Sequence, residues 1–256
     1  MAQQCGKEMS GDSRGTALPT MSTTPSFDWR QEWCELKEFL KKPRRGRGVS
    51  VPLSHGWRRI LFLLGVDLCF VLLVATPINA ILEHWAGLED KLDFNVRNMF
   101  LAVLVAPMIE ELIFRAGLRR VGYSLFVGPV LLSLYCAQSF TLIAIVAGVI
   151  LLAAVVDKIL MRRAPVGNGR RFARGRAFIR HYPYVFWFYT VCFGLAHLAN
   201  FYSTNDRDYL LLFAISAQLG GGCLLGYLRL RQGLASSVIL HCLHNSLFVT
   251  LLIMFN

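Results

Sequence analysis

Residues 60–82 read ILFLLGVDLCFVLLVATPINAIL, and Asp67 is the one charged side chain in this stretch. A helix needs about 20 such residues to cross a hydrocarbon core that is about 30 Å thick. In lipid, only helices and closed barrels satisfy their backbone hydrogen bonds. Because the stretch is continuously apolar rather than alternating, it predicts a membrane-spanning helix.

Composition extends this prediction to the whole chain. Of its 256 residues, 55% are hydrophobic, and the mean hydropathy is +0.47. A soluble domain of this size is rarely so apolar. The net charge of +11 is also typical of nucleic-acid binding, but here Lys and Arg gather at the ends of apolar runs. That distribution fits the positive-inside rule, so we expect membrane lipid as a partner and no nucleic acid.

Further apolar runs predict an all-α bundle of about seven or eight transmembrane spans. One run, residues 123–156, would form a helix of about 50 Å, which is too long for the bilayer. Both of its ends are basic, so we predict a hairpin that turns near Gln138 and Ser139. The predicted spans are 60–82, 98–118, two helices within 123–156, 184–200, 209–228 and 234–255.

Loop charges predict the orientation of these spans. The basic segments 41–47 and 158–181, the second expected as a loop, are placed in the cytoplasm. The acidic loop 83–96 is placed outside, together with the loop that carries Asp206 and Asp208. We therefore expect an integral protein of the inner or cytoplasmic membrane, with its N-terminus inside and its C-terminus outside.

The chain is predicted to have two parts. Residues 1–57 form a polar cytoplasmic N-terminal region, and residues 58–256 form the transmembrane domain. Within the first part, residues 1–26 are expected to be disordered, without a cleavable signal peptide. Residues 29–40 are expected to form a short amphipathic helix. The seven cysteines include no CxxC pair, so no disulfide framework is predicted.

Ionisable groups inside predicted spans mark candidate functional residues, because each one is costly in lipid unless it is paired or hydrated. Glu111 and Arg115 are four residues apart and are expected to pair on one helix face. This arrangement leaves Glu110 without a local partner. His241 and Asn245 share a face of the last span. The remaining polar residues of these spans are Asp67, His197 and His244, of which His244 is expected to bond a backbone carbonyl.

Three of these residues are predicted to lie at one depth. Counted from the cytoplasmic edges of their spans, Glu110, His197 and His241 lie about 14–15 Å into the membrane at about 1.5 Å per residue. A shared depth favours one polar pocket formed by three helices. The alternative is a structural polar cluster that holds the helices together.

Three short motifs connect these residues to a known family. Residues 110–115 read EELIFR and match EExxxR. Residues 193–197 read FGLAH and match FxxxH, and residues 241–245 read HCLHN and match HxxxN. In order and setting they resemble the CAAX protease and bacteriocin-processing family of intramembrane endopeptidases, which includes the type II CAAX prenyl endopeptidase. The resemblance covers about residues 98–256.

The resemblance implies peptide-bond hydrolysis by an activated water in a polar cavity among helices. By matching position, Glu110 would be the general base and His197 would help to hold the water. His241 and Asn245 would stabilise the oxyanion. Phe193 belongs to the second motif. The pair formed by Glu111 and Arg115 would support the site.

The sequence departs from the family in one respect. About 80 residues separate Arg115 from His197, which is long for the family, and the intervening segment holds an extra apolar hairpin and an arginine-rich stretch. The sequence therefore does not determine the route by which a substrate reaches the site. It also leaves the roles of segment 121–181 and of the N-terminal region undetermined. A span count of seven is also one short of the eight that are common in the family.

The need for a metal is a separate question. Two histidines and a glutamate are suitable zinc ligands, and Glu110, His197 and His241 would be the ligands if a metal is bound. The helical HExxH signature is absent from the sequence. We favour a mechanism without an obligate metal, with zinc as the alternative.

Two other functions remain open at this stage. One is a non-catalytic membrane interaction or immunity protein that keeps the same fold. The other is a transporter that uses Glu110 for protons, for which no inverted repeat is found. For a peptidase, the expected substrate is a membrane-associated or prenylated peptide, and the sequence does not distinguish CAAX processing from bacteriocin maturation.

Overall fold

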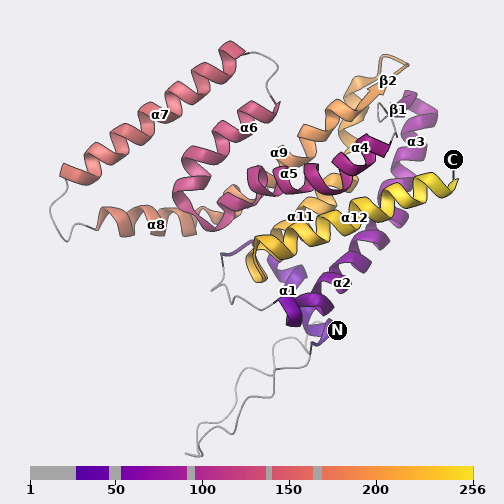
Figure 1. Ribbon diagram of the computed structural model, residues 1–256, viewed down its shortest axis with the longest axis horizontal. Helices are drawn as coiled ribbons and strands as arrows, with labels where there is room; N and C mark the ends of the chain where they lie inside the picture. Colours follow the sequence, from indigo (N-terminus) through magenta and orange to yellow (C-terminus); the bar gives the residue numbers. More distant parts are fainter. Residues whose placement is uncertain (1–26, 46–52, 91–95, 137–139, 164–168, 256) are drawn as a thin grey trace, which may run out of the picture.

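A computed structural model describes residues 27–45, 53–90, 96–136, 140–163 and 169–255, and nearly all of them are helical (Figure 1). The segment predicted to be disordered and the turn predicted near residues 138–139 lie outside the described residues. The α-helices are α1 (Trp29–Lys41), α2 (Leu53–Phe70), α3 (Thr76–Ala86), α4 (Val96–Phe100), α5 (Ala106–Phe114), α6 (Gly128–Cys136), α7 (Phe140–Arg163), α8 (Arg170–Arg180), α9 (Tyr182–Ala196), α10 (Leu211–Ala214), α11 (Ser216–Arg231) and α12 (Leu234–Phe255). The π segments are η1 (Val71–Ala75), η2 (Leu101–Val105) and η4 (Tyr123–Val127), and the 3-10 segments are η3 (Ala116–Arg119), η5 (His197–Asn200) and η6 (Asp208–Leu210).

Among the residues that the structure describes, four helical stretches are long and apolar enough to cross a membrane. They are Gly56–Ala86, Ile143–Leu160, Asp208–Arg231 and Leu234–Leu251, with Tyr123–Cys136 as a shorter apolar helix. The all-α, polytopic prediction is confirmed, and the last predicted span has the bounds of α12. The count of seven or eight spans remains a prediction, because α9 has only 15 residues and the α4–α5 segment is divided by η2.

Each π segment lies just before a proline. Pro77, Pro107 and Pro129 each follow the last residue of a π segment by two positions. A proline has no N–H to donate, and its ring collides with the carbonyl oxygen four residues earlier. Widening the preceding turn into a π-bulge relieves that collision without ending the helix. At Pro107 the helix therefore continues through a widened turn just before Glu110.

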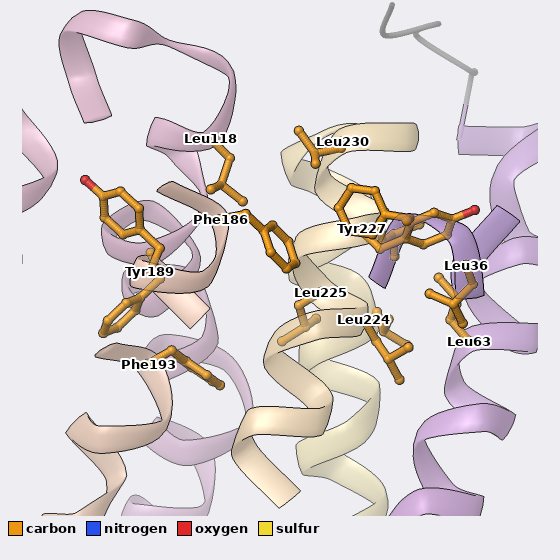
Figure 2. Packing of buried hydrophobic residues seen from close by; sticks show 14 of the residues in the cluster. Leu36, Leu63, Leu118, Phe186, Tyr189, Phe193, Leu224, Leu225, Tyr227 and Leu230 are labelled. Atoms are coloured by element: carbon orange, nitrogen blue, oxygen red, sulfur yellow. The ribbon is translucent and has the colours of Figure 1, made fainter. Parts of the chain in front are cut away.

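Helix α11 is the centre of the bundle and packs against α2, α9 and α12. Figure 2 shows the ring of Phe186 of α9 directed toward Leu225 of α11, while Leu224 lies on the side of α11 that faces Leu36 and Leu63. These side chains belong to one buried apolar cluster, to which α1 contributes Leu36. The centre of this integral membrane protein is therefore formed by helix-to-helix packing, whereas many large apolar side chains on the periphery are exposed.

Glycines allow α9 and α11 to approach closely. A methyl group on Gly226 would lie 2.6 Å from a ring carbon of Phe186, and one on Gly194 would lie 2.7 Å from the Leu219 side chain. Small residues at helix contacts are typical of membrane bundles, where close packing rather than hydrophobic burial drives association. Gly226 of α11 and Gly194 of α9 thus let α9, and with it His197, lie close to the centre of the bundle.

The loops predicted outside the membrane meet at one end of the bundle (Figure 1). Strand β1 (Leu88–Asp90) pairs antiparallel with β2 (Phe201–Ser203). Gly87 turns the chain from α3 into β1 with a φ of 58°, and a side chain there would collide with Thr204. Because the two loops lie at the same end of the bundle, the structure agrees with the predicted alternation of the spans. The side of the membrane that this end faces remains a prediction.

The expectation of a loop over residues 158–181 is wrong. Helix α7 continues to Arg163, and residues 170–180 form α8. Arginine is a good helix former, so a high density of positive charge does not by itself prevent a helix. Arg174 of α8 pairs with Asp157 of α7 at 2.5 Å, which offsets part of the charge repulsion.

The predicted amphipathic helix is observed as α1 and packs against the bundle. Glu32 is buried and accepts hydrogen bonds from Arg59 of α2 and Tyr227 of α11, both at 2.7 Å. Leu36 and Phe39 lie in the apolar cluster. The N-terminal helix is thus part of the packed structure, although the boundary predicted at residue 57 stays a prediction.

The close contact of α9 with α11 predicts an effect on stability. In Gly226→Ala the new methyl group presses on the fully buried ring of Phe186, so unfolding should become easier by about 1–3 kcal/mol. In the control Gly148→Ala on α7, nothing lies within 4 Å of the added methyl group. The control should be neutral or stabilising by up to about 1 kcal/mol. Thermal unfolding in detergent measures both, and equal midpoints for the two variants would contradict the prediction.

Candidate active site

Two consecutive carboxylates on α5 occupy the interior of the bundle. Glu110 is 5% exposed and Glu111 is fully buried. Neighbouring residues on a helix point about 100° apart, so the two side chains enter different surroundings. Each carboxylate needs its own partners, because an unpaired buried charge is strongly destabilising.

Glu111 has a partner at each carboxylate oxygen. Its Oε1 is 3.3 Å from Nη1 of Arg115, one turn later on the same helix segment, and the guanidinium is 2% exposed. Ser237 of α12 donates a hydrogen bond of 2.5 Å to Oε2. The guanidinium carbon also lies 3.7 Å from the centre of the Phe193 ring. Glu111 and Arg115 therefore connect α5 to α9 and α12.

Glu110 faces the two histidines and one tyrosine. Its Oε2 lies 3.6 Å from Nε2 of His241 and 3.9 Å from Nε2 of His197. Its Oε1 accepts a hydrogen bond of 2.9 Å from the hydroxyl of Tyr135 on α6. Both imidazole distances exceed a direct hydrogen bond but suit a bridging water. One carboxylate oxygen is thus held by the tyrosine, and the other faces the imidazoles.

The second nitrogen of each imidazole also has a partner. Nδ1 of His197 lies 2.7 Å from the carbonyl oxygen of Phe193, which only accepts, so this nitrogen donates. Nδ1 of His241 lies 3.2 Å from Oε1 of Glu111. Both Nε2 atoms are consequently directed toward Glu110. Second partners of this kind determine ring orientation and tautomer.

Asn245 and His244 do not join this cluster. The side-chain amide of Asn245 donates to the carbonyl of Ala102 in η2 at 2.8 Å. His244 bonds the carboxylate of Asp67 on α2 rather than the backbone carbonyl that the sequence suggested. Asp67 is buried, so this pair gives the charge in the first span a partner. The motif residues therefore separate into a contact group around Glu110 and a neighbouring position at Asn245.

Two residues of the site are missing from the sequence prediction. Ser237 precedes His241 by four residues on α12, and this helical spacing is a signal that could have found it. Tyr135 has no such signal, since it lies 25 residues after Glu110 in an apolar stretch. Only the packing of α6 against α5 brings its hydroxyl to the carboxylate.

The residues expected to hold a metal are those around Glu110. Imidazole and carboxylate are suitable donors for zinc, and a tetrahedral site with bonds of about 2.0–2.2 Å holds its donors roughly 3.4 Å apart. Glu110 lies close to that spacing from both histidines, at 3.6 and 3.9 Å. Across the described residues, no three His, Cys, Asp or Glu side chains have the spacing of a metal site. A mechanism without an obligate metal stays a prediction, with zinc as the alternative.

Comparison with protein families gives a match that contains the whole contact group. The model of the Rce1-like type II CAAX prenyl endopeptidase family matches residues 93–247, which is more than half of the chain. The chain belongs to this family. Searches of curated proteins and of solved structures find no match. Membership in this CAAX endopeptidase family implies a membrane-embedded protease, and it agrees with the family that the three motifs resemble.

Because Glu111 pairs with Arg115, the stability of the protein should depend strongly on both charges. Glu111→Gln leaves the guanidinium buried without its counter-charge, and it should destabilise the protein by about 3–5 kcal/mol. The double variant with Arg115→Met removes both charges and should recover most of that loss. Thermal unfolding of the single and double variants in detergent tests this coupling. Additive losses in the double variant would contradict it.

Proposed function

We propose that this CAAX endopeptidase relative hydrolyses a peptide bond of a membrane-associated or prenylated peptide with a water molecule activated by Glu110 and His197. The observation that supports the proposal best is the position of Glu110. Its Oε2 faces Nε2 of His197 and of His241 at 3.9 and 3.6 Å inside the bundle. A water molecule beside a carboxylate and an imidazole at that separation can hydrogen-bond to both.

In the proposed first step, the water donates one hydrogen to Oε2 of Glu110 and the other to Nε2 of His197. His197 accepts there because its Nδ1 hydrogen is directed to the Phe193 carbonyl. Glu110 takes a proton from the water while the water oxygen bonds to the substrate carbonyl carbon. Glu110 later returns that proton to the leaving nitrogen as the peptide bond breaks.

Negative charge that develops on the substrate carbonyl oxygen is stabilised by hydrogen-bond donors directed at it. In the proposal, His241 takes this role as an imidazolium, whose Nδ1 hydrogen is donated to Oε1 of Glu111 at 3.2 Å. Its Nε2 hydrogen then faces the reacting centre. Asn245 uses one amide hydrogen on Ala102, and the second is available for the oxyanion. Glu111 and Arg115 support the cluster without contacting the substrate.

Substitution of the base tests the proposal directly. Glu110→Ala removes the proton acceptor and should lower cleavage of a farnesylated peptide about 100-fold to 10,000-fold. The purified chain in detergent is assayed by mass spectrometry of the peptide products. The control is Met108→Ala, an exposed position on the same helix. This variant should keep its activity within about twofold, and its free energy of unfolding should change by no more than the ±0.5 kcal/mol typical of surface substitutions.

Two results of that assay would reject the peptidase. One is full cleavage by Glu110→Ala, and the other is no cleavage by the wild-type chain of any prenylated or membrane-tethered peptide. The second result, with the cellular phenotype intact in Glu110→Ala, would favour the non-catalytic interaction or immunity protein. Substrate identity follows from the host proteins that change length when Glu110 is substituted.

Chelation tests the preference for a mechanism without an obligate metal. In the proposed mechanism Glu110 and the histidines act on water without a metal, so we expect 1,10-phenanthroline to leave cleavage within about twofold of the untreated enzyme. A zinc protease treated in parallel serves as the positive control. Loss of activity that added zinc restores would establish the alternative, with Glu110, His197 and His241 as ligands.

A further inference from the structure

The tyrosine on α6 approaches the candidate base from outside the three motifs. Tyr135 donates to Oε1 of Glu110 at 2.9 Å, whereas the histidines face Oε2. Its ring packs edge-on against the buried Phe114 with centroids 5.9 Å apart. The ring is therefore held by packing against α5 while its hydroxyl is directed at the carboxylate.

The contact between Tyr135 and Glu110 comes from the segment that is extra relative to the family. Helices α6 and α7 form the apolar hairpin that the sequence marks as extra between Arg115 and His197, and they stand to one side of the bundle (Figure 1). Within the part of the chain that the structure describes, α6 packs on α5, whereas the membrane-spanning stretch of α7 has no buried residue. The inserted hairpin thus reaches the site through α6.

We propose that Tyr135 is a positioning residue that holds the Glu110 carboxylate in the orientation needed to activate water. This inference rests on the proposed function. A glutamate carboxylate rotates about its last side-chain bond over a broad range. With Oε1 held by the phenol, Oε2 is kept between the two imidazoles. The reacting oxygen is thereby selected by a residue of the inserted hairpin.

The hydrogen bond is compatible with every step of the proposed reaction. When Glu110 takes the proton from water on Oε2, Oε1 still accepts from Tyr135. The tyrosine neither gains nor loses a proton, so it does not compete with His197 for the water. Its contribution is to geometry, and it should therefore affect turnover rather than substrate affinity.

The chain contains a matched control for this contact. Tyr123, in the segment that leads into α6, also donates a 2.9 Å hydrogen bond to α5, but its acceptor is the backbone carbonyl of Leu112. Tyr123→Phe and Tyr135→Phe each remove one hydroxyl and one hydrogen bond to the same helix. Only the second change releases the carboxylate of Glu110.

The test measures kcat and KM of the full-length chain on a farnesylated peptide. Tyr135→Phe should lower kcat about tenfold with KM unchanged, because a hydrogen bond to a charged group contributes a factor of that order. Tyr123→Phe should leave both constants within about twofold, as for a neutral surface change. Thermal unfolding of each variant excludes a general loss of structure.

A second measurement does not depend on catalysis. Dicyclohexylcarbodiimide, an apolar reagent for carboxyl groups, should label Glu110 several-fold faster in Tyr135→Phe than in wild type or Tyr123→Phe, as read by peptide mass spectrometry. Faster labelling together with the selective fall in kcat supports the proposal. Unchanged kcat in Tyr135→Phe overturns it, as does an equal fall in Tyr123→Phe or a rise in KM alone. Absence of cleavage by the wild-type chain rejects the proposed function, and the positioning role with it, whatever the labelling shows.

Discussion

The burial of four ionisable side chains at the junction of α5, α9 and α12 is the constraint on which the site depends. Glu110, Glu111, Arg115 and His241 are all at most 5% exposed. Charges in such surroundings persist only when each has a partner at close range. Arg115 and His241 both face Glu111, and His241 also faces Glu110. The three helices therefore keep their relative positions or lose the pairing.

The rest of the bundle provides the close approach that this pairing needs. Gly194 and Gly226 let α9 lie against α11, and α11 in turn packs on α12. The π segment before Pro107 adjusts α5 just ahead of the carboxylates. One irregular backbone segment, η2, thus lies next to the site. Single π-helical turns inside α-helices are frequent at functional sites.

The division of work between Glu110 and Glu111 follows from their partners. Glu111 is surrounded by an arginine, a serine hydroxyl and an imidazole, so its lone pairs are in use. Glu110 has one oxygen held by Tyr135 and the other facing nitrogen atoms beyond direct hydrogen-bond distance. Two identical side chains, one residue apart, therefore have different surroundings. In the proposed mechanism, one supports the site and the other exchanges a proton.

The sequence by itself determined the membrane class, most of the helices and the residues of the contact group. Long apolar runs and the four-residue spacing of Glu111 and Arg115 are local properties of the sequence, so they can be recognised without coordinates. Only the tertiary structure decided that Tyr135 meets Glu110, that His244 pairs with Asp67 and that Asn245 bonds Ala102. Contacts between distant helices depend on the packing of α6, α2 and η2 against their neighbours. No periodicity within one helix encodes that packing.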